Sequence, residues 1–403
     1  MEQTSDVVSE QDVERWRKSL EEVEQRVGEY FARSEARYRA IEYITGLLGT
    51  VERKNSWQLA ELAGDATPYA FQHLLGRARW EADAVRDELQ QYIADHLADP
   101  AGVVVIDETG FLKKGRHSAG VARQYSGTAG RVENCQIGVF LTYVSRNTHT
   151  LLDRELYLPQ EWTADPARCA QAGIPAEIRF RTKPALAQQM LARVLDSSLP
   201  VAWVTGDSVY GDARTLRLWL EEREQAYVLG VTGKAYVWIG WRQHRVSTLL
   251  QSLPDEGWTR LSAGDGSKGP RLYEWYWLPI GAALQEADRR WLLVRRSLTD
   301  AHELKAFVAF TPPGTTLSEL VRVAGIRWAI ESDLESAKDE IGLDHYEVRA
   351  WTGWYRHVTL ALWAQAFLNV IRARHLDLEM AKKGAPQPGS LAHFKAQRGW
   401  SCA

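Results

Sequence analysis

The chain has 403 residues, 45% apolar and 25% charged, which is an ordinary globular composition and predicts two or three domains. Its longest apolar run, residues 358–371, is interrupted by Gln365 and Asn369 and falls short of the roughly 20 residues that span a bilayer, and three scattered cysteines exclude a disulfide framework and a closed zinc site. The net charge of −3 argues against a dedicated nucleic-acid binder, but the first 30 residues carry −5 and the remainder carries +2, so a local basic groove is compatible with it.

Residues 1–98 are predicted to form a helical domain, because apolar side chains recur there at three- and four-residue spacings. The acidic first residues lack the basic and apolar segments of a signal peptide, so a cytoplasmic protein is expected. Within the domain, a helix over 56–63, a turn with a cap and a first-turn proline at 65–68 and a helix over 69–76 suit a helix-turn-helix. This pair could read DNA. Two packed helices joined by a capped turn are also common in any helical bundle, so the DNA-reading and the purely structural interpretation both stay open.

Residues 99–233 are predicted to form the first part of an α/β core. The run AGVVVID, which starts at Ala101, is typical of a fully buried strand. Strands followed by alternating strands and helices indicate a mixed α/β sheet covered by helices. The other strands are predicted at 136–144, 151–158, 201–205 and 226–231, and the helices at 185–195 and 215–223.

A β-rich insertion is predicted over 234–313, because strand patterns alternate with turn-rich stretches there. Helix returns in the segment 314–375, which completes the core, and 376–403 is expected to be a mobile tail. The strands of the insertion are predicted at 236–243, 272–278 and 291–295.

Two acids follow apolar strands. Asp107 comes after Val103–Ile106, and Asp207 comes after the strand at 201–205. Ligands bind at strand ends in open α/β sheets, so both positions suit a metal ligand. An acid that caps the following turn is an equally good interpretation of Asp107, whereas the neighbouring Asp212 is assigned to capping the next helix.

A third acid lies on a predicted helix. Arg327, Glu331 and Lys338 are four and seven residues apart, which places them on one helix face. Taken alone, this pattern favours a solvated ladder of ion pairs, in which Glu335 would serve equally well. Together with the two aspartates, Glu331 could complete a site for two Mg²⁺ or Mn²⁺ ions that promote phosphoryl transfer.

The ordered acids Asp107, Asp207 and Glu331 resemble the triad of the DDE transposases of bacterial insertion sequences, and the resemblance covers roughly residues 55–375. One branch has a tyrosine-arginine-glutamate-lysine signature and a β-rich insertion before the glutamate. Arg327, Glu331 and Lys338 fit the last three signature positions, and Ala324 stands at the tyrosine position. The run Asp207-Ser208-Val209-Tyr210-Gly211 resembles the second-aspartate motif of the branch, and IDETGFLKKGRHSAGVARQYSGTAG resembles a subgroup.

The resemblance implies an RNase H-like fold and a transposase that cleaves double-stranded DNA at terminal inverted repeats and joins the ends to target DNA. A nucleoid-associated protein that works as a homodimer on DNA is then expected. A domesticated DNA-binding regulator and a stand-alone RNase H-like nuclease remain alternatives. Asp107, Asp207 and Glu331 are expected to be catalytic and to hold the metal, and the expected DNA-binding residues are Arg327, Lys338, Lys113, Lys114, Arg116, Arg123 and Tyr210.

Two further residue types have a structural and a functional interpretation. His117 and His357 could move protons, but a structural histidine is the favoured interpretation because two-metal chemistry needs no histidine base. The chain has 17 tryptophans, and in relatives that cut DNA through a hairpin an insertion residue of this kind stacks on a flipped base. Trp238, Trp241, Trp275 and Trp277 fall in the predicted insertion, and core packing is favoured for any single one of them.

Overall fold

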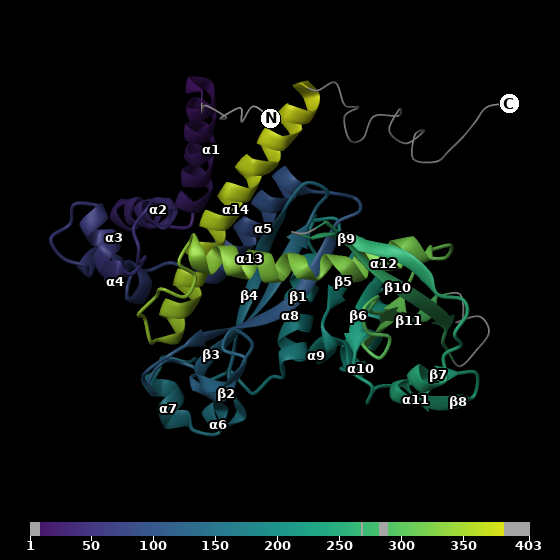
Figure 1. Cartoon of the computed structure of the whole chain (residues 1–403). Helices are drawn as coiled ribbons and strands as arrows, with labels where there is room; N and C mark the ends of the chain where they lie inside the picture. The colour runs from purple at the N-terminus through teal and green to yellow at the C-terminus, as the bar shows by residue number, and fades with distance from the viewer. Residues whose placement is uncertain (1–8, 267–268, 282–288, 383–403) are drawn as a thin grey trace.

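The computed structural model describes residues 9–266, 269–281 and 289–382. An elongated sheet runs through the middle of the molecule, with a helical bundle at the N-terminal end and one long C-terminal helix, α14 (Trp351–Lys382), across it (Figure 1). Within the described ranges, no helix is long and apolar enough to cross a membrane.

The N-terminal bundle has the predicted helical pattern. Val23 and Val27 of the first helix and Ile44 and Leu47 of the second are fully buried, as their spacing predicts. The turn before the fourth helix differs from expectation: Pro68 is itself the N-cap and no side chain caps this helix, whereas Asn55 caps the third helix. The five helices are α1 (Glu10–Gly28), α2 (Ser34–Leu48), α3 (Ser56–Leu62), α4 (Tyr69–Gly76) and α5 (Ala82–Leu97).

The sheet is mixed, which confirms the predicted α/β class. Along its main path the strands follow the order β2-β3-β1-β5-β6-β12-β11-β10-β9, with β4 paired to β3. The β1-β5-β6 part is parallel and the flanking pairs are antiparallel. The core strands are β1 (Val103–Leu112), β2 (Ala122–Ser126), β3 (Arg131–Val144), β4 (His149–Tyr157), β5 (Trp203–Gly206) and β6 (Tyr227–Val231).

Helices cover both faces of the sheet. Successive side chains along β1 point to opposite faces, and their contacts show which helix lies on which face. Thr109 contacts the C-terminal end of α13, whereas its neighbour Glu108 contacts the start of α8. α13 and α8 therefore lie on opposite faces. The remaining core helices are α6 (Gln160–Thr163), α7 (Pro166–Gln171), α8 (Lys183–Leu195), α9 (Ser208–Gly211), α10 (Arg214–Glu222), α12 (Leu317–Ile326) and α13 (Trp328–Asp339).

The predicted insertion is largely a continuation of the central sheet. β12 pairs antiparallel with β6, and β11, β10 and β9 follow it, so one sheet runs through both regions. Among the described strands, only β7 and β8 form a separate two-stranded sheet. The elements of this region are β7 (Tyr236–Ile239), β8 (Arg242–Arg245), α11 (Val246–Gln251), β9 (Thr259–Gly266), β10 (Gly269–Pro279), β11 (Arg290–Arg296) and β12 (Leu304–Phe310).

The long helix α14 ties the bundle to the sheet. It contacts α5, α2 and α4 on one side and β4 on the other, and Val358 and Trp363 are fully buried. The helix continues to Lys382, so residues 376–382 of the segment predicted as a mobile tail are helical. The rest of that prediction, 383–403, lies outside the described residues.

Candidate active site

Strand register brings two of the predicted acids together. β1 and β5 are parallel neighbours, with Ile106 opposite Gly206, and Asp107 and Asp207 each come one residue later. Both carboxylates therefore leave the sheet at the same level. Asp107 does not end its strand as predicted, because β1 continues to Leu112 against β3; only the pairing with β5 ends there.

The electrostatics of the pair favour a bound cation. Burial, and then the nearby charge of Asp207, raise the pKa of Asp107 to about 7. Burial and the charge of Glu108 also raise the pKa of Asp207, although the N–H of Val209 donates to its carboxylate at 2.8 Å. The protein thus holds two carboxylates whose repulsion it does not fully neutralise, and oxygen ligands of this kind suit a hard divalent cation.

The predicted helix α13 approaches the pair through Arg327, which directly precedes it. The Arg327 guanidinium donates to Asp107 at 3.2 Å and also to Glu331, whose side chain is 57% exposed. In this arrangement no group of three or more His, Cys, Asp or Glu side chains among the described residues is close enough to hold a metal ion. Glu331 would have to leave Arg327 to join the two aspartates.

The three acids and Arg327 line one cavity of about 580 Å³. Strands of the insertion contribute a cationic wall that the sequence analysis missed: Arg271, Arg295 and Lys305. Burial and the neighbouring charge of Arg295 lower the pKa of Lys305 and of Arg271. The sequence did not indicate that these three cations belong together, because they lie far apart in the chain and only the pairing of β10, β11 and β12 brings them to the cavity.

α13 is also fixed to the sheet by its buried side. Asp333 is 2% exposed, and one of its carboxylate oxygens pairs with Nδ1 of His149 on β4 at 2.8 Å. At the end of the helix, the Lys338 ammonium donates to the hydroxyls of Thr109 and Thr128 at 2.7 and 2.9 Å. Lys338 therefore fastens α13 to β1, two residues from Asp107, rather than standing free for a phosphate.

The other predicted DNA-binding cations fall into two groups. The Lys113 ammonium lies 3.5 Å from the centre of the Tyr346 ring, and burial lowers the pKa of Lys113 to about 8, so it packs against the core. Lys114, Arg116 and Arg123 are exposed.

Tyr210 does not have the position expected of a DNA contact. Its side chain is fully buried, and its hydroxyl donates to Glu108 at 2.6 Å. Glu108 also pairs with Lys183 at 2.7 Å. The tyrosine of the Asp-Ser-x-Tyr-Gly motif therefore orients a neighbouring carboxylate, and neither Glu108 nor Lys183 was singled out from the sequence.

Two residues with a favoured structural interpretation have structural contacts. His357 is fully buried, Nδ1 lies 2.8 Å from the hydroxyl of Tyr43, and burial lowers the pKa of His357 to about 3. Asp212 does not cap α10; it accepts hydrogen bonds from the backbone and hydroxyl of Thr232 and so holds the end of β6. His117, by contrast, is exposed.

The insertion tryptophans also divide into two groups. Trp275 is 1% exposed and lines the cavity, and Trp277 stacks on Trp291 with 4.2 Å between ring centres. These side chains pack the sheet. Trp238 and Trp241 are 44% and 86% exposed, so they are the insertion tryptophans that could reach a base.

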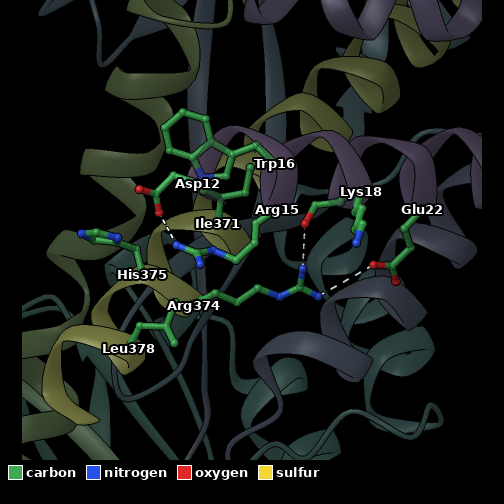
Figure 2. Close-up of a pocket in the computed structure, with 10 residues that line it drawn as sticks. Asp12, Arg15, Trp16, Lys18, Glu22, Ile371, Arg374, His375 and Leu378 are labelled. Atoms are coloured by element: carbon green, nitrogen blue, oxygen red, sulfur yellow. Dashed lines mark hydrogen bonds and ion pairs between the residues drawn. The ribbon is translucent and has the colours of Figure 1, made fainter. Parts of the chain in front are cut away.

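A second cleft, of about 280 Å³, lies between α1 and the C-terminal part of α14 (Figure 2). Within it, Arg374 donates to the hydroxyl of Ser19 at 2.8 Å and lies 3.7 Å from Glu22, and Arg15 pairs with Asp12. None of the candidate acids lines it. This cleft is therefore a packing feature between helices and not an extension of the site.

The aspartate pair lies within a span of the chain that matches a known family. The family model of the DDE superfamily endonucleases matches residues 26–249, more than half of the chain, and this span contains Asp107 and Asp207. The chain belongs to this family. Family membership makes the protein an endonuclease that acts on DNA and depends on a divalent metal ion. The match ends before Glu331, which the structure nevertheless brings to the same cavity.

A curated relative is similar along most of the chain. It is a "Probable transposase for insertion sequence element IS701" from Microchaete diplosiphon, 25% identical over 326 residues, or 79% of this chain and 80% of the relative. The similarity thus extends well beyond the span of the family model.

Proposed function

We propose that this DDE endonuclease is the transposase of an insertion sequence, which cleaves DNA at the ends of the element and joins the freed 3′-hydroxyls to target DNA. The observation that carries the proposal is the cavity shared by Asp107, Asp207 and Glu331. The similarity to a probable insertion-sequence transposase over 79% of the chain supports strand transfer over simple hydrolysis.

Asp107, Asp207 and Glu331 are the proposed metal ligands. Two Mg²⁺ ions, or Mn²⁺ in their place, would activate the attacking oxygen and stabilise the leaving oxygen of the phosphoryl group. The protein contributes fixed carboxylates, two of them aligned by strand register. Arg327 is then free to contact the phosphate backbone, and Lys305 and Arg295 continue the cationic wall along which DNA would lie.

DNA contacts outside the cavity are proposed for two surfaces. Lys114, Arg116 and Arg123 are exposed cations after β1 and would hold phosphates. In the helical domain over residues 1–98, the α3–α4 pair would read the terminal inverted repeats, and the exposure of Trp57 and Tyr69 at 53% and 61% supports this. Because two ends must be joined, a homodimer on DNA is proposed, with the nucleoid as its place of action.

The test uses a labelled fragment that carries the DNA flanking the gene, incubated with purified protein and Mg²⁺. Discrete cuts are expected with Mg²⁺ and none with EDTA. Glu331→Gln should reduce cleavage at least about 100-fold, because a metal ligand is lost, whereas the matched variant Glu335→Gln, one turn further along α13, should cleave like the wild type.

Each outcome decides between functions. Cleavage by Glu331→Gln at the wild-type rate would overturn the site assignment. Metal-independent binding without any cut would favour a domesticated regulator. Cuts in unrelated DNA, without joining of ends, would favour a stand-alone nuclease.

A further inference from the structure

The segment that leaves β1 is basic in a protein of net negative charge. Between Thr109 and Val132 the sequence has five Lys or Arg residues and no Asp or Glu. Lys114, Arg116 and Arg123 of this segment are exposed. The segment includes β2 and the turn into β3, which together form a hairpin at one end of the sheet path (Figure 1).

The hairpin exposes an apolar pair among these charges. Tyr125 on β2 and Val132 on β3 are cross-strand partners, and they are 61% and 51% exposed. Single exposed apolar side chains need no explanation, but a tyrosine directly opposite a valine on the exposed face of a two-stranded hairpin forms a patch that water does not favour. The surrounding cations disfavour burial against an apolar protein surface and match a polyanion.

The turn of the hairpin lies beside the proposed active site. The Thr128 hydroxyl is 3.3 Å from that of Thr109, and the Lys338 ammonium at the end of α13 donates to both. Ser126 packs so closely on Gly110 that a Cβ at Gly110 would collide with its hydroxyl. The hairpin therefore folds back onto the strand that carries Asp107.

These contacts bound the distance from Tyr125 to the candidate metal ligands. Thr109 is two residues beyond Asp107, and Tyr125 is three residues before Thr128. With the two threonine side chains and the 3.3 Å between their hydroxyls included, the Cα atoms of Asp107 and Tyr125 lie at most about 26 Å apart. This is the length of about eight base pairs of duplex DNA. A duplex cleaved in the cavity passes within reach of the hairpin.

We propose that the β2–β3 hairpin is a DNA-gripping arm, which enters a groove within about eight base pairs of the cleaved phosphate and packs Tyr125 and Val132 against the bases. Lys114, Arg116 and Arg123 hold the adjacent phosphates. A two-stranded ribbon fits the major groove of B-DNA, which supports this mode of contact. The inference rests on the proposed cleavage of DNA in the cavity, but its test does not require cleavage.

The test measures binding of the flanking-DNA fragment in EDTA for Tyr125→Ala and Tyr125→Phe. Loss of the ring should weaken binding about tenfold, because the side chain no longer contacts the bases, and Tyr125→Phe should bind within about twofold of the wild type. The matched control is Tyr38→Ala, which removes an equally exposed tyrosine on α2 that lies beside Arg39. Thermal unfolding of each variant verifies that it is folded.

A hydroxyl-radical footprint of the same complexes shows where along the DNA fragment the Tyr125 side chain makes its contact. In Tyr125→Ala, protection should disappear over one short stretch of the fragment only, and where Mg²⁺ produces a cut, this stretch should lie within about eight base pairs of the cut. Arg123→Gln should lower the slope of log affinity against log salt concentration by about one, whereas Tyr125→Ala should leave this slope unchanged. Wild-type affinity and an unchanged footprint in Tyr125→Ala would overturn the proposal that the hairpin contacts DNA, even if Mg²⁺-dependent cleavage is observed. Absence of cleavage together with these binding changes would overturn the transposase proposal alone.

Discussion

At the scale of single residues, the site is a balance among four charges. Asp107 and Asp207 repel each other, and Arg327 neutralises this repulsion only in part while it also holds Glu331. All four positions were singled out from the sequence, because Asp107 and Asp207 follow apolar strands and Arg327 and Glu331 have the spacing of one helix face. It could not predict that Arg327 would stand between Asp107 and Glu331, since that depends on how α13 is placed over the sheet.

The raised pKa of Asp107 predicts a pH-dependent stability. The folded state keeps a proton on Asp107 up to a pH of about 7, whereas the unfolded state releases it near 4, so stability falls as the pH rises between these values. In EDTA at pH 8, the unfolding free energy of Asp107→Asn should therefore exceed that of the wild type by about 1–3 kcal/mol. Its melting temperature should be higher accordingly. At pH 4 the difference should be small.

The control for this measurement is Asp339→Asn, an exposed residue at the end of α13, which should show no such pH dependence. If Asp107 is a ligand as proposed, added Mg²⁺ should stabilise the wild type and have less effect on Asp107→Asn, because an ion that binds only the folded state stabilises it. An equal difference in melting temperature at pH 4 and pH 8 would contradict the account.

At the scale of elements, close backbone approach explains the glycine of the Asp-Ser-x-Tyr-Gly motif. A Cβ at Gly211, the last residue of α9, would collide with the carbonyl oxygen of Gly230 on β6. The short helix that begins at Asp207 thus lies directly against the next strand. The sequence motif indicated a special position, but only the contact between α9 and β6 explains why a side chain does not fit.

Gly211→Ala should force α9 away from β6 and cost about 1–3 kcal/mol of unfolding free energy, as overpacking in a core does. Urea unfolding measures this change. The control is Gly76→Ala in α4, where a Cβ meets no atom within 4 Å, and this variant should be as stable as the wild type or slightly more so. Cleavage by folded Gly211→Ala should also be slower, since Asp207 moves with α9; wild-type stability of this variant would contradict the packing account.

At the scale of the whole molecule, a buried ionic network joins the helical bundle to the core. Asp153 on β4 is fully buried, and it accepts hydrogen bonds from Arg193 on α8 at 3.0 Å and from Gln90 on α5 at 3.1 Å. Arg86, also on α5, lies 3.5 Å away. The boundary at residue 98 stays a prediction, but the bundle and the sheet share this network and the helix α14, so they should unfold together.

Asp153→Ala should destabilise the protein by about 3–5 kcal/mol, because it leaves buried cations without their partner. The control is Asp87→Ala, which removes another carboxylate that Arg86 contacts, at 2.7 Å, but one whose side chain is 62% exposed. It should cost less than about 1 kcal/mol. Urea unfolding followed by tryptophan fluorescence compares the two variants. Equal decreases in unfolding free energy would show that Asp153 does not stabilise the contact between the bundle and the core.

The sequence by itself determined the local features of this protein: the helices of the bundle, most strands of the core, the α/β class, and the order of Asp107, Asp207 and Glu331. These follow from periodicity and from residue types within short segments. β2 and β9 were not predicted, because their polar sequences gain their pairing from neighbouring strands. β12 was not predicted either, although its sequence LKAFVAF is mostly apolar.

Only the tertiary structure decided what depends on residues far apart in the chain. The register of β1 with β5 aligns the two aspartates, the pairing of β12 with β6 brings the cations of the insertion to the cavity, and the fold of the hairpin uses Lys338 as a fastener. Register and burial are properties of pairs of segments, and their free energy is gained only when those segments meet. A single sequence therefore identifies the chemical groups, and their packing determines how they are combined.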